Sequence, residues 1–345
     1  MASLITGGSG YLGGLLAQRL SKDPQDFICV DILPQSITCK NGTYYHADLC
    51  DCPLIEKIFA RHPIDHVFHF AAQLDFQTKS QKSLYNNNVQ STKNIAELCK
   101  RFKVKKLIYT SSNSVYLGNQ FLRPFSEGDI PTPIDAYGKS KVYCEKLLES
   151  YKDHFDYCIF RCPNIMDAGR VGMLSILFDF IRENRICWMI GNGRSNHQCL
   201  YAQDLFEAMF LTLKLKGPHT FNIGAERTST IKEMCTDLIV HAQSRSKIKA
   251  IPQNVLVPLL KFFHRCGLSP LGPYQFRMLT NDFSFNISHV QSVLHWQPTL
   301  SNSEMLIKAY DSYINNLGSF SSDSEISANR SQVKMGIINI VKILS

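Results

Sequence analysis

The stretch Ser3-Leu4-Ile5-Thr6-Gly7-Gly8-Ser9-Gly10-Tyr11-Leu12-Gly13 near the start of the chain decides the fold class. It runs from a short apolar segment through closely spaced glycines into Leu12–Leu20, which has helical periodicity. Within it, Gly8-x-Gly10-x-x-Gly13 fits the strand–turn–helix fingerprint of a dinucleotide site. Glycines there permit a tight turn, let the backbone approach a pyrophosphate, and let the new helix pack on the sheet. The stretch predicts an α/β fold that begins with a nucleotide-binding loop.

Strand-like runs and helical segments then alternate over the first 160 residues. This alternation predicts a Rossmann-type, doubly wound parallel sheet with helices on both faces. The predicted strands are Ser3–Ile5, Phe27–Val30, Tyr44–His46, His66–Phe70, Leu107–Thr110 and Tyr157–Phe160, and the predicted helices are Leu12–Leu20, Leu54–Ala60, Tyr85–Phe102 and Ala136–Tyr151.

The pattern loosens after Arg161, where we expect a smaller C-terminal substrate-binding lobe. Further helices are predicted near 173–183, 204–215 and 230–243, and a further strand at Thr220–Ile223. The expected division is a nucleotide-binding domain over 1–164, to which 190–224 returns, and a substrate lobe over 165–189 and 225–316.

The tail has a different composition. Residues 317–331 are rich in serine and predict a linker. Residues 332–345 alternate apolar side chains with lysines, which predicts a short amphipathic helix. Such a helix either makes a weak contact with a membrane surface or docks on its own domain or on a dimer partner.

Composition narrows the class of protein. The 345 residues are 44% apolar and 19% charged, as in ordinary globular proteins, and the net charge of +8 suits anionic ligands such as nucleotide sugars. No stripe of Lys and Arg with interleaved aromatics is present, so nucleic acid is not an expected partner. The twelve cysteines form no paired framework, and Cys50 and Cys52 have the wrong spacing for zinc. We therefore expect reduced thiols, no metal and a cytoplasmic location, with no secretory signal and no apolar run of membrane-spanning length.

An acid follows the second predicted strand. Asp31 ends the apolar run Phe27-Ile28-Cys29-Val30, where a carboxylate can accept hydrogen bonds from the adenosine ribose. It would repel a 2′-phosphate, which favours NAD over NADP. Asp48, after Tyr44-Tyr45-His46-Ala47, is either a contact to the adenine edge or a solvated loop residue.

Tyr137 and Lys141 form the one Tyr-x-x-x-Lys of the chain, and Ser112 precedes them at the end of a predicted strand. A helix places residues i and i+4 on one face. Asp135 is a plausible N-cap for that helix. We expect the ammonium of Lys141, together with a positive nicotinamide, to lower the pKa of Tyr137 so that it moves a proton. Ser112 would orient the reacting hydroxyl or carbonyl.

At this point the chain resembles the extended short-chain dehydrogenases/reductases, in particular the NAD-dependent epimerase/dehydratase branch. The resemblance runs from about residue 3 to about residue 315. It rests on the glycine loop, His69-Phe70-Ala71-Ala72, Asn88-Val89-Gln90-Ser91-Thr92, the serine segment Thr110–Tyr116 and Tyr137-Gly138-Lys139-Ser140-Lys141. It implies catalytic roles for Ser112, Tyr137, Lys141 and Asn88, and NAD binding by Gly7, Gly10, Tyr11, Leu12, Gly13, Asp31, Asp48, Leu49, Ala71, Ala72, Tyr137 and Lys141.

Departures from the family pattern bear on the substrate. Dehydratases and decarboxylases of the family usually carry an acid just after the catalytic hydroxyl residue, where this chain has Asn113 and Ser114. His197 stands where epimerases often have an arginine that holds the nucleotide diphosphate. Asn164 occupies the position of a diphosphate-contacting asparagine, and Arg277 is a candidate second contact. The predicted substrate-binding residues are Ser112, Asn164, His197 and Arg277.

Three functions follow from these features. The first is an NAD-dependent oxidoreductase or epimerase acting on a hydroxyl or keto carbon of a nucleotide sugar. The second is an oxidoreductase like the 3β-hydroxysteroid dehydrogenases, favoured by His197 and by the apolar stretch Val255–Leu260. The third, a non-catalytic NAD-binding scaffold, is opposed by the intact Ser112, Tyr137 and Lys141. The resemblance also implies a homodimer through the helices that contain Tyr85–Phe102 and Ala136–Tyr151.

Overall fold

The computed structural model describes most of the chain between residues 2 and 317. The described residues are 2–35, 39–74, 80–120, 122–254, 258, 274, 277–278 and 281–317. Most of the apolar stretch 255–263, the serine-rich linker after 317 and the predicted tail helix 332–345 lie outside the described residues.

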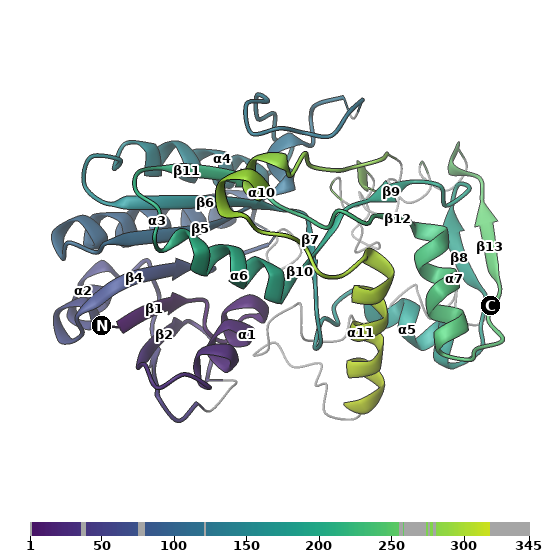
Figure 1. Ribbon diagram of the computed structural model, residues 1–345, viewed down its shortest axis with the longest axis horizontal. Helices are drawn as coiled ribbons and strands as arrows, with labels where there is room; N and C mark the ends of the chain where they lie inside the picture. Colours follow the sequence, from purple (N-terminus) through teal and green to yellow (C-terminus); the bar gives the residue numbers. More distant parts are fainter. Residues whose placement is uncertain are drawn as a thin grey trace.

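A parallel seven-stranded sheet forms the centre of the larger part of the molecule (Figure 1). The strand order β11-β6-β5-β4-β1-β2-β3 is that of a doubly wound Rossmann-type sheet, so the predicted fold class is confirmed. All seven strands predicted from the sequence are present. They are β1 (Ala2–Thr6), β2 (Phe27–Asp31), β3 (Gly42–His46), β4 (Ile64–His69), β5 (Lys106–Ser112), β6 (Asp156–Cys162) and β11 (His219–Asn222).

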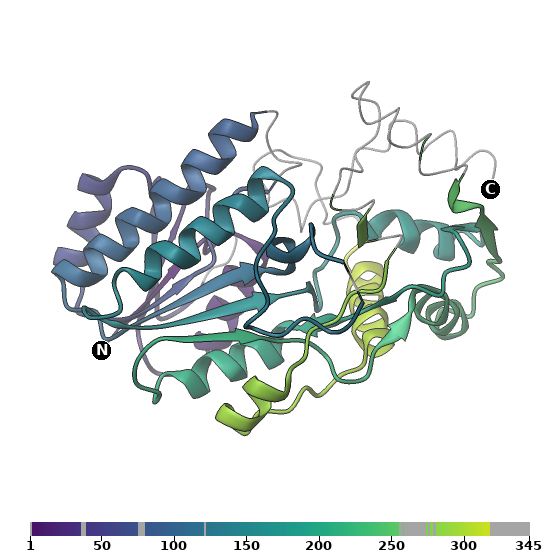
Figure 2. The same ribbon diagram turned by 90° about the horizontal axis from the view of Figure 1, so that it is seen from above.

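Helices cover both faces of this sheet (Figure 2). One face carries α2 (Cys52–Arg61), α3 (Gln81–Arg101) and α4 (Ala136–Glu149), and the other carries α1 (Tyr11–Leu20), α6 (Ala202–Thr212) and α10 (Ser288–Leu294). Successive strand residues point to opposite faces. Leu4 accordingly packs in the cluster under α2, α3 and α4, whereas Ile5 packs in the cluster under α1 and α6. Both faces are buried at the centre of the sheet, which explains the unbroken apolar run Phe27–Val30 of β2.

Side-chain caps fix where the helices of one face begin. The side chain of Asp51 accepts from the amide of Leu54 at the start of α2, and Ser80 accepts from Ser83 at the start of α3. Asp135 accepts from the Gly138 amide at 2.6 Å and caps α4, as predicted. A cap satisfies an amide that the first helical turn leaves without a partner. The cap at Asp135 thus sets the register of the helix that carries Tyr137.

The remaining elements build a smaller part with its own apolar cluster. Its pairs of strands are β7 with β10, β9 with β12 and β8 with β13. The indole of Trp296 donates to the carbonyl of Asp204 at 2.9 Å, which ties the returning chain to α6. The helices and strands of this part are β7 (Asn164–Met166), α5 (Leu174–Arg182), β8 (Cys187–Ile190), β9 (Asn196–His197), β10 (Cys199–Tyr201), β12 (Ser229–Thr230), α7 (Ile231–His241), β13 (Ile248–Ile251) and α11 (Asn302–Asn315). In the main sheet, a short 3₁₀ helix, η2 (Asn113–Tyr116), follows β5.

Two features are absent from the described residues. No helix there is both long and apolar enough to cross a membrane. No group of three His, Cys, Asp or Glu side chains there could hold a metal ion. The described cysteines are all free thiols.

Candidate functional site

The sheet reverses its winding between β1 and β4. From β1 the chain builds outward through β2 to β3, and from β4 it builds the other way through β5 to β6. In such sheets a ligand binds outside the carboxyl ends of the strands at this switch point. The glycine loop follows β1 there, and Ala71 and Ala72 follow β4. The amide of Ala71 donates to Thr6 Oγ1 at 3.3 Å, so the two strand ends are linked.

The glycine loop has the shape that a dinucleotide requires. Gly7 has a φ of +74°, a conformation that side chains disfavour. A Cβ at Gly13 would lie 2.1 Å from the carbonyl oxygen of Gly7, so only glycine lets α1 start this close to the loop. A Cβ at Gly10 would meet only Gly7 within 4 Å and would otherwise project into open space, where a pyrophosphate fits. Gly10 also begins α1 without a side-chain cap, leaving first-turn amides for an anion. These residues fit NAD.

Asp31 holds the glycine loop in place. Its Oδ2 accepts from the amide of Ser9 and its Oδ1 from the amide of Leu33, both at 2.9 Å. Burial raises the pKa of this carboxyl, and the backbone hydrogen bonds oppose the rise. A carboxylate has about four acceptor positions, so two backbone bonds leave capacity for ribose hydroxyls. Asp31 therefore positions the loop, and its contact with NAD stays a prediction.

The other predicted cofactor residues lie at the same edge of the sheet. Asp48 is exposed after β3, and its Oδ1 accepts from the Cys50 amide at 2.9 Å. Leu49 beside it is buried. Tyr11 and Leu12 form the first turn of α1, and Ala71 and Ala72 are partly exposed beyond β4. No contact decides between the adenine role and the solvated role of Asp48.

Asn88 joins the segment after β4 to the catalytic helix. Its Oδ1 accepts from the amide of Gln73 at 2.7 Å, and its Nδ2 donates to Ser140 Oγ at 3.1 Å. Its side chain is buried. Both the oxygen and the nitrogen of the Asn88 carboxamide are thus hydrogen-bonded to other residues of the protein. This arrangement positions α4 against the chain that follows β4, and a direct part in the chemistry stays a prediction.

Ser112, Tyr137 and Lys141 come together as the motif predicts. Ser112 ends β5, and its hydroxyl lies near the phenol of Tyr137. Lys141 lies one turn along α4, with Nζ 5.6 Å from the centroid of the Tyr137 ring, and donates to the carbonyl of Thr110 at 2.7 Å. Lys141 is buried, whereas Ser112 and Tyr137 keep partial exposure. The two groups able to touch a substrate thus face accessible space.

The electrostatics of Tyr137 differ from the expectation. Burial raises the pKa of its phenol well above the ordinary value, with Tyr274 and Asp135 contributing, and the nearby Ser112 hydroxyl is the influence that lowers it. Burial also lowers the pKa of Lys141 to about 8, because a desolvated ammonium is disfavoured. The protein alone therefore keeps Tyr137 as a neutral phenol. A phenolate here needs a further positive charge, which oxidised nicotinamide carries.

Tyr274, which the sequence reasoning missed, closes the site from the smaller part. Its hydroxyl lies 3.3 Å from Oδ1 of both Asn113 and Asn164. The Ser112 hydroxyl donates to Asn113 Oδ1 at 3.2 Å, so one polar chain runs from Ser112 to Asn164. Tyr274 lies next to a proline and a few residues before Arg277, but nothing in that local sequence marks a site residue. Its role comes from a contact between distant segments.

The other two predicted substrate residues lie apart from this chain of contacts. His197 is a buried residue of β9 whose Nε2 has no hydrogen-bond partner among the described residues, and burial lowers its pKa to about 4. Arg277 donates to the carbonyls of Leu117 and Asn119 at 3.0 and 2.9 Å. It therefore braces the loop after η2. Substrate contact by either residue stays a prediction.

A buried ion pair fixes the catalytic helix to the sheet, and it too was not foreseen. Arg161 of β6 and Glu145 of α4 are both nearly inaccessible to solvent, with Nη2 and Oε2 2.6 Å apart. The hydroxyl of Ser111 donates to the same carboxylate. Glu145 lies one turn after Lys141, and Ser111 directly precedes Ser112. The pair thus connects the two elements that carry the catalytic groups.

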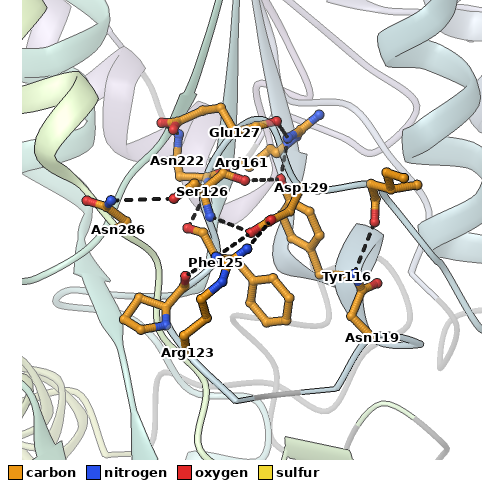
Figure 3. A network of polar contacts seen from close by, with 12 residues as sticks. Tyr116, Asn119, Arg123, Phe125, Ser126, Glu127, Asp129, Arg161, Asn222 and Asn286 are labelled. Atoms are coloured by element: carbon orange, nitrogen blue, oxygen red, sulfur yellow. Dashed lines mark hydrogen bonds and ion pairs between the residues drawn. The ribbon is translucent and has the colours of Figure 1, made fainter.

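The same arginine also holds the loop that leads to α4 (Figure 3). Arg161 donates to the hydroxyl of Tyr116 and to the carbonyl of Glu127. The Glu127 carboxylate accepts from the amide of Asn222 at 2.8 Å, and the Asn222 side chain donates to the carbonyl of Phe125 at 3.0 Å. Strands β6 and β11 therefore both fix this connection.

Comparison with known proteins agrees with this site. Residues 3–224 match the model of the NAD dependent epimerase/dehydratase family. A UDP-glucose 4-epimerase of Halalkalibacterium halodurans is 32% identical over 323 residues, which cover 84% of this chain and 96% of that protein. A human dTDP-D-glucose 4,6-dehydratase is 25% identical, over 68% of this chain and 72% of that protein.

Solved structures show the same fold. The UDP-glucose 4-epimerase of Thermotoga maritima, crystallised with UDP-glucose, superposes with a TM-score of 0.75 at 22% identity and covers 92% of this chain and all of that one. The family match spans the glycine loop, Ser112 and the Tyr137–Lys141 pair, and it ends just after β11. This chain therefore belongs to the NAD-dependent epimerase/dehydratase family and is an enzyme whose cofactor is NAD.

Proposed function

We propose that this enzyme is a nucleotide-sugar epimerase in which Tyr137 transfers the proton. The observation that carries the proposal is the Ser112–Tyr137–Lys141 arrangement beside the open glycine loop. Ser112 orients the sugar hydroxyl, and Tyr137 takes its proton as a carbonyl forms at that carbon. NAD held at the glycine loop would supply the hydride acceptor and donor for that carbon. The keto sugar would turn over in between, so that the hydride returns to the other face of the carbon while Tyr137 gives the proton back to the oxygen.

The residues after Ser112 favour epimerisation over dehydration. Elimination of water from a sugar needs an acid beside the reacting carbon. Asn113 follows Ser112 where dehydratases of the family usually carry that acid, and its Oδ1 lies 3.2 Å from the Ser112 hydroxyl and 3.3 Å from that of Tyr274. Ser114, the next candidate, is fully buried. A carboxamide holds neighbours in place but does not deliver a proton. The reaction therefore stops at exchange of configuration.

A second candidate is oxidation of an apolar alcohol, as in the 3β-hydroxysteroid dehydrogenases. The observation that favours it is His197, whose depressed pKa of about 4 keeps it neutral at pH 7 where an epimerase often has a permanent cation. A neutral imidazole gives a substrate diphosphate no charge partner. On this reading the substrate is uncharged, and NADH accumulates instead of being reoxidised.

The test is to incubate the purified enzyme with excess NAD and UDP-hexoses, and separately with a 3β-hydroxysteroid. We expect a new sugar epimer with no net NADH. NADH formed in proportion to oxidised steroid, with the UDP-hexoses unchanged, would replace this proposal by the second. Tyr137→Phe tests both of these enzymatic functions against a scaffold that merely binds NAD. Loss of turnover with NAD binding retained would exclude the scaffold, whereas full turnover in the variant would show that Tyr137 takes no part in the chemistry.

We also propose that the enzyme is a homodimer through α3 and α4. Tyr143 of α4 is 47% exposed, and its ring contacts that of Tyr85 on α3 with centroids 6.2 Å apart. An exposed aromatic pair on two adjacent helices is a surface that a second copy can cover. Light scattering should give twice the chain mass for the wild type. A monomer at micromolar concentration would end this proposal.

A further inference from the structure

Arg170 lies at the site with an unsatisfied positive charge. It follows β7 in a turn where Gly169 has a φ of +76° and the Arg170 amide donates to the carbonyl of Asp167 at 3.1 Å. The centre of its guanidinium is 5.4 Å from the centroid of the Tyr11 ring. Within the part of the chain that the structure describes, this guanidinium makes neither an ion pair nor a hydrogen bond.

The carboxylate of the same turn does not neutralise this charge. Asp167 accepts from the side chain of Gln203 at 2.9 Å and from the amide of Ala168 at 2.7 Å, and it faces Lys308 at 4.0 Å. Burial meanwhile lowers the pKa of Arg170, which means that its surroundings disfavour the cation. The side chain still keeps partial exposure, so a ligand can reach it. A desolvated cation without a counter-ion is costly unless a ligand supplies the negative charge.

The surroundings of Arg170 come from both halves of the site. Tyr11 is the first residue of α1 and directly follows Gly10 of the cofactor loop. Its hydroxyl donates to the carbonyl of Asp167 at 3.1 Å, which fixes the turn before Arg170. On the other side, Tyr274 is a second phenol that interacts with the Arg170 charge, and Tyr274 contacts Asn164. Arg170 therefore lies where the cofactor loop meets the proposed substrate residues.

We propose that Arg170 binds a diphosphate at this boundary and supplies the cation that His197 does not. A guanidinium presents a planar fork of donors that matches phosphate oxygens, and it stays charged at any working pH. The diphosphate belongs either to the nucleotide sugar, an assignment that rests on the proposed function, or to NAD itself. Both sources have the same chemistry, and binding measurements on each ligand separate them.

The test compares wild type, Arg170→Gln and Arg170→Lys by calorimetric titration with UDP, uridine and NAD. If the diphosphate is the substrate's, Arg170→Gln weakens UDP binding about 10- to 100-fold, as expected for loss of a charge-assisted contact, and leaves uridine and NAD unchanged. If it is the cofactor's, the loss appears with NAD instead. Arg170→Lys keeps the positive charge but lacks the planar fork of donors, so its affinity for the diphosphate ligand should lie between those of the wild type and Arg170→Gln. The proposal is overturned if Arg170→Gln binds UDP as tightly as the wild type does and also binds NAD as tightly as the wild type does.

Thermal unfolding without ligand separates binding from a structural role. Removing an unpaired cation should leave Tm unchanged or raise it, whereas loss of a structural arginine lowers it. Arg245→Gln, at an exposed position between α7 and β13, makes the same change of charge away from the site and should alter neither affinity. A marked fall in Tm for Arg170→Gln, but not for Arg245→Gln, would also count against the proposal. Failure of the wild type to bind UDP or convert UDP-hexoses would contradict the proposed function, while the NAD titration would still decide the role of Arg170.

Discussion

The phenol of Tyr137 is held in a place that disfavours its anion. Burial raises its pKa, and the nearby Ser112 hydroxyl opposes this only in part. Lys141 is near the ring, but its own pKa is depressed to about 8 by burial, so its positive charge is itself weakly held. Tyr137 therefore becomes a good proton acceptor only when a positively charged ring lies beside it. If Tyr137 is the base, as we propose, oxidised nicotinamide would supply that charge.

Replacing Tyr137 by phenylalanine tests this role. General acid–base catalysis contributes about 10²- to 10⁴-fold to a rate, so kcat should fall by that factor while NAD still binds. Steady-state kinetics and a calorimetric NAD titration measure the two effects. Tyr143→Phe makes the same change on an exposed position of the same helix and should keep full kcat. Comparable activity in the two variants would show that another group moves the proton.

Gly13 tests the loop on the cofactor side. A Cβ there would lie 2.1 Å from the Gly7 carbonyl oxygen, so Gly13→Ala must move backbone atoms of the loop or of α1. Overpacking of this kind costs about 1–3 kcal/mol, and NAD affinity should fall at least tenfold. Urea unfolding and NAD titration give the two numbers. Gly128→Ala is the matched control, because a Cβ at Gly128 meets nothing within 4 Å. Unchanged NAD binding in Gly13→Ala would contradict the assigned loop geometry.

At the scale of elements, α4 is placed by groups other than its catalytic residues. The Asp135 cap sets where it begins, Asn88 contacts Ser140 near its start, and Glu145 pairs with Arg161 further along. Each contact joins α4 to a different part of the domain. Because Tyr137 must meet a substrate held largely by other elements, an error of about 1 Å in the position of α4 would cost much of the rate.

The Glu145–Arg161 pair gives the prediction at this scale. Glu145→Gln leaves a buried guanidinium without its counter-charge, which should lower the free energy of unfolding by about 3–5 kcal/mol. Glu145→Gln combined with Arg161→Met should recover much of that loss, since no unpaired charge remains. Urea unfolding of both single variants and the double variant measures the coupling. Glu149→Gln, exposed on the same helix, should change stability by less than about 0.5 kcal/mol. A single variant as stable as the wild type would show that the pair contributes nothing.

The elements that the sequence predicted are those whose pattern is local. Strand β2 reads as an unbroken apolar run because both its faces are buried, and α4 carries its cap and its Tyr/Lys motif within a few residues. The short strands β7, β9 and β12 were not predicted. They span only two or three residues each, and pairing with distant segments creates them. No periodicity can be read from so few residues.

The site shows the same limit. Ser112, Tyr137 and Lys141 are recognisable because one chain segment and one helix turn set their spacing. Tyr274 and Arg170 have no such local signal, and each becomes a site residue only through a contact with a distant part of the chain, Tyr274 with Asn164 and Arg170 with Tyr11. In the protein alone burial raises the pKa of Tyr137, which sequence spacing does not reveal because burial depends on distant neighbours; the lowering expected with a positive nicotinamide present stays a prediction.

At the scale of the whole molecule, the smaller part is joined to the main sheet by buried polar contacts. Asp204 of α6 accepts from the indole of Trp296 through its carbonyl, and its carboxylate accepts from the amide and hydroxyl of Thr299. Asn302 donates to the carbonyl of His197, which links α11 to β9. Buried polar groups with satisfied partners favour one arrangement over others. The two parts are therefore held in a defined relation, as a site built from both requires.

The buried histidines make this assembly sensitive to acid. Burial lowers the pKa of His197 to about 4 and that of His69 to about 3, whereas the unfolded chain titrates near 6.5. Between these values the unfolded state binds protons that the native state does not, so the free energy of unfolding falls as pH drops below 6.5. For His197 the loss at pH 4 approaches about 3 kcal/mol, from 1.36 kcal/mol for each pKa unit. Above pH 6.5 this stabilising contribution is fully present.

The measurement is the free energy of unfolding from urea titrations between pH 7 and pH 4. His197→Gln removes the group that must stay neutral, so its stability should decline less steeply than that of the wild type by up to about 3 kcal/mol at pH 4. His154→Gln makes the same change at an exposed position that solvent reaches in both states, and it should reproduce the wild-type slope. His69 is a poorer choice for the variant, because its ring nitrogens bond Thr6 and Thr92 at 2.7 and 3.0 Å and their loss would lower stability at every pH. Parallel pH profiles for the wild type and His197→Gln would mean that the imidazole accepts a proton without unfolding, which requires water or an acidic group within reach of Nε2.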